Sequence, residues 1–187
     1  MFGDLKTRSD HASLSFILLI ILLLAFASCN NKSDKRMPEH RPDKNEMVDL
    51  NRYFVQKDRE RIQNYIERKN LKMTESPTGL WYHIIKEGDG VKFTDSDKVN
   101  LDYECSLLDG TKCYSSKELG QMEVVIGKSK MESGLNEGLR MLSQGGEAIF
   151  IMPPFLAYGF IGDGRKIPSR AVIVYNIYNL RAKKYLE

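Results

Sequence analysis

The sequence predicts an α+β fold, in which an antiparallel sheet of about five to six strands curves around one short helix and a longer helix precedes it. From Thr74 onward, short β-type apolar segments follow one another, separated by Gly, Pro and Asp-Gly turn signals. One short segment among them has helical spacing, and a longer helical pattern lies before them. Successive strands with a segregated helix are typical of this class, because the helix covers one face of the sheet.

The most regular strand is 99–108, in which alternate residues from Val99 to Leu107 are apolar and share one face. Asp109-Gly110 follows it and is a strong hairpin signal, so the chain is expected to return as a neighbouring strand. The expected strands are 80–85, 99–108, 111–114, 122–126, 147–152 and 171–180.

Two helices are expected. In 134–142 three leucines recur at helical spacing, and Ser133 can serve as a cap or pre-cap residue. In 47–70 apolar residues gather near one face, charged residues fill the rest, and Asn70 is a suitable end. The helix 47–70 would either dock a partner or a second copy, or pack on its own domain, and its imperfect apolar stripe fits both.

The N-terminal segment reads as a targeting signal. Lys6 and Arg8 precede an apolar run, 14–26, which is too short for a comfortable transmembrane helix. Small residues follow and then Cys29, so 26–29 resembles the lipobox of bacterial lipoproteins, in which the cysteine is lipidated and becomes the mature N-terminus. The alternative is an uncleaved membrane anchor with an incidental cysteine. Both interpretations place the domain in the cell envelope, tethered to a bacterial membrane and facing the periplasm or the surface.

The predicted domain organisation has four parts. Residues 1–28 form the signal peptide, and 29–46 form a flexible linker that is rich in charge and almost devoid of apolar residues. Residues 47–72 hold the N-terminal amphipathic helix, and 73–187 form the globular domain.

Composition excludes several functional classes. The net charge of +3 is too small to indicate a nucleic-acid partner. Of the three histidines, one lies in the signal and one in the linker, which leaves only His83 in the domain. A histidine-based triad or a His-rich metal site therefore cannot be built. The chain has no phosphate-binding glycine loop either, so neither a cofactor nor a metal is expected.

Cys105 and Cys113 flank the hairpin at Asp109-Gly110. An exported protein lies in an oxidising compartment, where such a pair could form a disulfide. A two-residue turn would set Cys113 opposite Ser106 and point Cys105 to the other face, where a bridge is difficult. A bulge or a longer turn would change that parity. We expect two free thiols, and no nearby pattern of cationic residues marks either as a catalytic nucleophile.

The apolar run 148–152 stops at Pro153-Pro154, and a long connection follows. Loops of this length are usually functional or disordered, and this one contains Phe155, Tyr158, Phe160 and Ile167. Its apolar residues indicate a loop that folds over an apolar pocket.

The residues 78–182 resemble the FKBP-type peptidyl-prolyl cis/trans isomerase domain. The resemblance includes Met-Pro-Pro-Phe-Leu-Ala-Tyr-Gly at 152–159 and Gly-Leu-Asn-Glu-Gly at 134–138, with further matching segments in the same order. The other matching segments are 78–82, 99–103, 108–111, 167–168 and 174–177. The predicted fold is therefore FKBP-like. With its signal and leading helix, the whole chain is similar to the gliding-motility-associated peptidyl-prolyl isomerase lipoproteins.

The resemblance implies a set of site residues. Tyr103 would be a pocket wall, and the Tyr158 hydroxyl would bond a substrate carbonyl. The backbone N–H of Glu132 would be a second donor, a role to which its side chain is irrelevant. Ile167 would come from the covering loop and Tyr175 from the last strand. The implied substrate-binding residues are Cys113, Tyr114, Met122, Met131, Leu135 and Phe160.

Four positions depart from the family, which usually has Trp at Leu135, Phe at Cys113, Asp at Tyr114 and Ile at Glu132. Losing two aromatics widens the pocket and removes binding surface, so a lowered activity toward small peptides is expected. Each departure also has a plainer explanation, because Leu135 can simply fill the core and methionines can take up the space.

Two functions follow from the resemblance. The first is an envelope-tethered prolyl isomerase that assists folding of proline-containing exported polypeptides. The second is a non-catalytic FKBP scaffold that binds a partner, or a second copy of the chain, through the altered pocket or the helix 47–70, in a motility or secretion assembly.

Overall fold

The computed structural model describes residues 43–183. The predicted signal peptide, Cys29 and residues 29–42 of the predicted linker lie outside the described residues. Within 43–183, no helix combines the length and the apolar character that crossing a bilayer requires.

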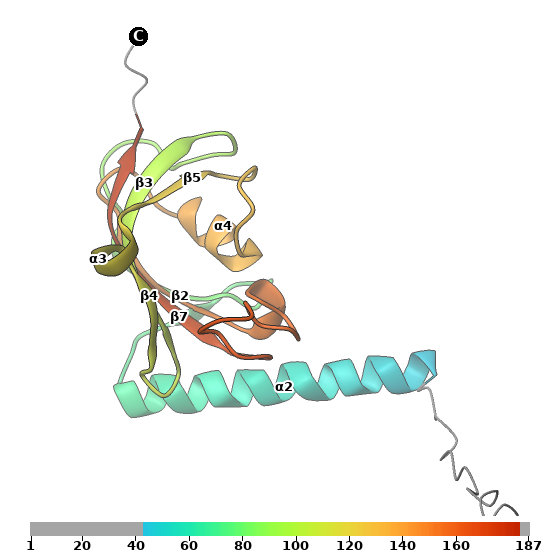
Figure 1. The fold of residues 1–187 in the computed structure, drawn as a ribbon. Helices are drawn as coiled ribbons and strands as arrows, with labels where there is room; N and C mark the ends of the chain where they lie inside the picture. The colour runs from blue at the N-terminus through green and yellow to red at the C-terminus, as the bar shows by residue number, and fades with distance from the viewer. Residues whose placement is uncertain (1–42, 184–187) are drawn as a thin grey trace, which may run out of the picture. The chain divides into compact units, whose positions relative to one another are not determined.

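The described chain forms a seven-stranded sheet with three α-helices and a 3-10 turn (Figure 1). Every strand pairing is antiparallel, and the strand order is β1-β2-β6-β7-β3-β4, with β5 also paired to β3. The strands are β1 (Thr74–Glu75), β2 (Trp81–Lys86), β3 (Lys98–Leu107), β4 (Lys112–Ser115), β5 (Met122–Val125), β6 (Glu147–Met152) and β7 (Ile173–Ala182). The helices are α2 (Lys44–Lys69), α3 (Ser116–Leu119), α4 (Ser133–Leu139) and the 3-10 turn η1 (Pro154–Leu156). The predicted α+β class is confirmed, with the two-residue β1 and the short α3 as additions.

The two sides of the sheet are covered by different helices (Figure 1). Phe150 and Met152 of β6 join the core cluster that contains the leucines of α4, whereas Ile151 between them joins the cluster around Ile62 of α2. Neighbouring strand residues point to opposite faces, so β6 is buried on both sides. This explains why 147–152 is a continuous apolar run, and its predicted bounds are confirmed.

The helix α4 begins at Ser133, so the predicted capping role of Ser133 is wrong. Glu132 occupies the N-cap position without a side-chain capping bond, and the Ser133 hydroxyl instead donates to the carbonyl of Leu156 at 3.4 Å. The helix also ends before its predicted end, at Leu139, where the amides of Met141 and Leu142 bond to carbonyls three residues back.

The helix α2 starts earlier than predicted because Asp43 and Glu46 form a capping box. Asn70 ends it in the left-handed conformation (φ 50°), as the sequence predicts. The second half packs on the domain through Ile62, which is only 1% exposed. The first half leaves most of its apolar side chains exposed, so each of the two expected roles fits one half of the helix. These exposed residues are Met47, Val48, Leu50, Tyr53 and Val55.

The β3–β4 hairpin contains a bulge that the two-residue turn does not predict. Cys105 pairs with Tyr114 and Ser106 pairs with Lys112, which leaves Cys113 as the extra residue. Both cysteines consequently enter the core, and both are free, as expected. Burial raises the pKa of the Cys105 thiol to about 12, and burial also raises the pKa of Cys113. Neither thiol is therefore activated as a nucleophile.

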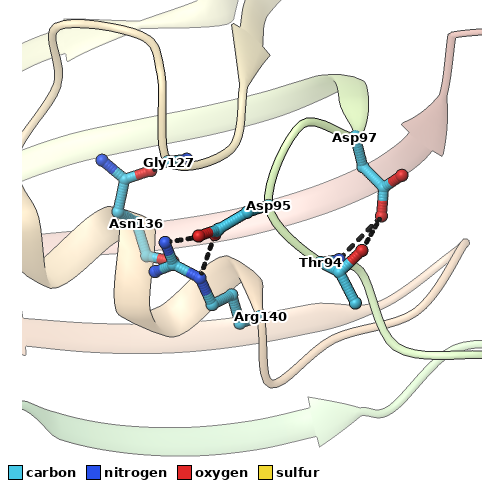
Figure 2. A network of polar contacts seen from close by, with 6 residues as sticks. All are labelled: Thr94, Asp95, Asp97, Gly127, Asn136 and Arg140. Carbon is cyan, nitrogen blue, oxygen red and sulfur yellow. Dashed lines mark hydrogen bonds and ion pairs between the residues drawn. The ribbon is translucent and has the colours of Figure 1, made fainter.

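A polar network holds the segment that leads into α4 (Figure 2). Arg140, which follows α4, donates through Nε to Asp95 at 2.7 Å, and the amide of Gly127 donates to Asn136 Oδ1 at 2.8 Å. Gly127 has φ +75°, and a side chain there would lie 2.8 Å from Asp95. The network thus fixes the turn at 127 against α4, and the segment 128–132 starts from a fixed point.

Candidate functional site

A groove of about 870 Å³ opens between β5, the segment before α4, the residues after η1, and β7. Of the residues that the sequence predicted for the site, five line it: Met122, Met131, Glu132, Tyr158 and Tyr175. The other lining residues are Glu123, Val124, Ser129, Lys130, Ser133 and Ala157. The groove therefore joins four segments that are far apart in the sequence.

The side chain of Glu132 lies in a position that the sequence did not predict. Its side chain is turned inward, the residue is only 8% exposed, and Oε1 accepts a hydrogen bond of 3.0 Å from the Tyr175 hydroxyl. A glutamate at an N-cap with no capping bond is free to turn this way. The sequence interpretation gave Glu132 a backbone role only, so the position of its side chain is an addition from the structure.

The tyrosine hydroxyls of the groove remain protonated. Burial raises the pKa of Tyr158 well above its ordinary value, and a hydrogen bond to Glu132 raises it further. Burial and the nearby Glu132 carboxylate raise the pKa of Tyr175 in the same direction. Since an ordinary tyrosine already stays neutral below about pH 10, both groups are hydrogen-bond donors at physiological pH.

Tyr103 and Leu135 lie behind the groove rather than at its surface. The Tyr103 ring lies 5.9 Å from the Tyr175 ring, centroid to centroid, and burial raises the pKa of its hydroxyl. Leu135 is fully buried in the core cluster and is absent from the groove lining. The plainer explanation of Leu135, that it fills the core, thus describes its position.

The covering loop is organised by a carboxylate that the sequence interpretation missed. Asp163 accepts hydrogen bonds from the amides of Arg165 and Ile167, each at 2.8 Å, and from the hydroxyl of Tyr114. The Cys113 thiol faces the carbonyl of Lys166 in the same loop. Cys113, Tyr114 and Ile167 therefore lie together, with Asp163 supplying a carboxylate beside the position where the family usually has Asp.

Phe160 does not line the groove. It is exposed and lies 6.3 Å from the Phe54 ring of α2, centroid to centroid. The guanidinium of Arg170 lies 3.6 Å from the Phe54 ring centroid, and its Nη2 is 3.0 Å from Asp58 Oδ2. The end of the covering loop is therefore clamped to α2, and Phe160 belongs to this clamp instead of the predicted substrate site.

These omissions have different causes. Asp163 carried a local signal, because an Asp followed by Gly in a loop favours side-chain bonds to nearby amides. The clamp formed by Asp58 and Arg170 joins residues 112 positions apart and carried no local signal. Within residues 43–183, no group of three or more His, Cys, Asp or Glu side chains could hold a metal ion.

Solved structures place the fold. The crystal structure of AtFKBP13 matches with a TM-score of 0.54 at 26% identity, covering 58% of this chain and 96% of that chain. The crystal structure of FkpA from Escherichia coli matches with a TM-score of 0.60 at 21% identity, covering 97% of this chain and 75% of that chain, and shows likeness of fold alone. The domain therefore has an FKBP-like fold.

Residues 90–178 match the family model of the FKBP-type peptidyl-prolyl cis-trans isomerases. The chain is 40% identical over 110 residues to a probable FKBP-type isomerase, FkpA, of Neisseria meningitidis serogroup B, covering 59% of this chain and 39% of that protein. It is 35% identical over 118 residues to FkpA of Aeromonas hydrophila, covering 63% of this chain and 42% of that protein. The chain thus spans less than half the length of either relative.

Proposed function

We propose that the domain is a peptidyl-prolyl cis/trans isomerase that acts on proline-containing segments of exported polypeptides. One observation carries this proposal: two protonated tyrosines, the half-buried Tyr158 and the buried Tyr175, meet in one groove beside the methionines of its wall. The match of residues 90–178 to the family of FKBP-type peptidyl-prolyl cis-trans isomerases supports the same reaction.

The reaction requires no nucleophile. Amide resonance gives the X–Pro bond a rotational barrier of about 18–20 kcal/mol, and the barrier falls when the twisted amide is bound more tightly than the planar one. The twisted amide is the less polar species, so a groove with apolar walls that excludes water favours it. The Tyr158 hydroxyl would hold the substrate carbonyl while the proline ring lies against Met122 and Met131.

The test is a refolding assay with a protein whose slow phase is limited by proline isomerisation. Tyr158→Phe keeps the ring and removes the hydroxyl, so we expect catalysis to fall by roughly 3- to 10-fold, the value of one hydrogen bond. Tyr53→Phe is the matched control, because Tyr53 is 56% exposed on α2 and does not line the groove. Catalysis by Tyr158→Phe equal to that of the unaltered chain would remove Tyr158 from the mechanism.

A non-catalytic binding module is the second candidate. It is favoured by the Tyr175 hydroxyl, which already donates to Glu132, and by Leu135 and Cys113, which replace aromatic residues of the family. This candidate predicts that a folded chain, verified by circular dichroism, leaves the slow refolding phase unchanged. Acceleration of that phase in proportion to the amount of chain added would reject it.

We propose that the mature chain is tethered to an envelope membrane through a lipid on Cys29. The apolar run 14–26 and the small residues before Cys29 support this anchor. Cys29→Ala should move the chain from the membrane fraction to the soluble fraction, and full retention in the membrane would favour an uncleaved anchor.

A role in gliding or secretion rests on the resemblance alone, and normal gliding and secretion in a deletion strain would contradict it.

We further propose that the chain self-associates through the first half of α2. The support is its exposed apolar side chains, among them Met47, Leu50 and Tyr53, each about half exposed within the described domain. Sedimentation of the purified chain measures this directly. A single monomer species at all concentrations would contradict the proposal.

A further inference from the structure

The groove contains a charge that an isomerase site does not require. Glu132 is only 8% exposed, and its side chain accepts a hydrogen bond from a neutral hydroxyl, that of Tyr175. Tyr158, the other polar neighbour, is also neutral. Glu132 therefore lines the groove with hydrogen-bond donors at its carboxylate but without an opposite charge.

The cations near the groove do not neutralise Glu132. Among the described residues, Lys130 lines the groove but is exposed and forms no ion pair with Glu132. Lys183 is committed to Glu123 at the rim, with Nζ 2.6 Å from Oε2. Burying a carboxylate without a cationic partner is costly, since the loss of solvation is only partly offset by neutral donors. A ligand that brings a cation into the groove recovers part of that cost.

Proline itself cannot be that cation. Its ring is apolar and its amide nitrogen carries no hydrogen, so it offers Glu132 neither a charge nor a donor. The residue beside the proline is the next group of the substrate that can reach the carboxylate. The long flexible chains of Lys and Arg can lie along the methionines Met122 and Met131 while their charged ends reach inward.

We propose that Glu132 is a specificity-determining residue that selects polypeptide segments with a Lys or Arg directly beside the proline. This inference rests on the proposed isomerase function and names the substrate class of the same groove. The carboxylate acts on binding of the flanking residue and takes no part in rotating the amide.

The experiment uses the purified chain and two sets of proline peptides, one varied before the proline and one varied after it. Each set carries Lys, norleucine or Glu at the varied position, and norleucine matches the Lys side chain without its charge. We expect kcat/KM for the Lys peptide to exceed that for the norleucine peptide about tenfold in at least one set, and the Glu peptide to be the poorest. In Glu132→Gln, which keeps size and hydrogen bonding, the Lys-to-norleucine ratio should fall to about one.

Glu123→Gln is the matched control, because Glu123 lines the same groove but its carboxylate already pairs with Lys183. The ratio of kcat/KM for the Lys peptide to that for the norleucine peptide should be the same in this variant as in the unaltered chain.

Equal kcat/KM for the Lys and norleucine peptides in both sets would overturn the inference and leave the isomerase proposal intact. If no peptide is isomerised, the isomerase proposal fails, and calorimetric binding of the same peptides decides the charge preference. Tighter binding of Lys peptides that disappears in Glu132→Gln would support charge selection, and equal binding would overturn it.

Discussion

At the scale of single residues, the domain depends on a few positions where backbone or ring atoms approach closely. Gly138 of α4 lies directly over the ring of Phe150, and a Cβ at 138 would lie 2.6 Å from its Cζ. Glu132 is the opposite case, a side chain that turns inward because it has no capping bond at the start of the same helix. One short helix thus supplies both a tight core contact and the charged group of the groove.

The first prediction at this scale concerns Gly138→Ala. Alanine favours a helix over glycine by about 1 kcal/mol, but the added methyl group would press on the buried Phe150 ring at a cost of about 1–3 kcal/mol. We expect a net loss of up to about 2 kcal/mol in the free energy of unfolding, measured by urea denaturation.

Gly134→Ala is the matched control for that prediction. Its added methyl group would meet the Met152 side chain, with Sδ at 2.6 Å and Cγ at 2.8 Å, and an unbranched methionine can adjust more easily than an aromatic ring. A loss in Gly134→Ala as large as in Gly138→Ala would contradict the rigid contact with Phe150.

At the scale of elements, α2 and the covering loop act as one unit. Arg170, at the end of the loop, has φ 57° and bonds its amide to Gly159, so the loop closes on itself. The same residue stacks on Phe54 and pairs with Asp58 of α2. Because Tyr158 and Ile167 lie within or beside this loop, α2 stabilises the covering loop of the groove without lining that groove.

The prediction for this clamp concerns Asp58→Ala. Asp58 has a side chain only 6% exposed, whereas Arg170 is partly exposed, so losing the pair should cost about 2 kcal/mol of unfolding free energy. Amide hydrogen exchange in the segment 159–170 should accelerate, because that segment loses its attachment to α2.

The control for the clamp is Asp49→Ala in the same helix. Its carboxylate pairs with Arg52, and the two side chains are 73% and 76% exposed, so the expected cost is below about 0.5 kcal/mol. Equal effects of the two substitutions would show that the Asp58–Arg170 pair contributes no more than a surface ion pair.

At the scale of the whole molecule, what the sequence predicts well is local. The strand 147–152 and the end of α2 at Asn70 follow from neighbouring residues alone, and both are found as expected. The bulge at Cys113 and the inward turn of Glu132 depend on strand register and on distant partners. The resemblance named Tyr158, Tyr175 and Glu132, which line one groove, but it named Glu132 for its backbone amide and not for its side chain.

The buried acids also determine how the whole domain responds to alkali. Cys105, Tyr158 and Tyr175 have pKa values raised by burial, so in the folded state they keep protons that the unfolded chain releases above about pH 8.5 for cysteine and about pH 10 for tyrosine. A raised folded-state pKa gives stability that is complete below the unfolded-state pKa and is lost as the pH rises toward the folded-state pKa. We therefore expect the free energy of unfolding to fall from about pH 8.5 upward, and more steeply above about pH 10, by roughly 1.4 kcal/mol per pH unit for each fully titrating group.

Urea denaturation between pH 7 and 11 measures this slope, and Tyr158→Phe should make it shallower above pH 10, because the phenylalanine has no proton to release. Tyr53→Phe removes an exposed tyrosine and should leave the slope unchanged. An identical slope in Tyr158→Phe and in the unaltered chain would mean that the Tyr158 hydroxyl titrates in the folded groove as it does in water.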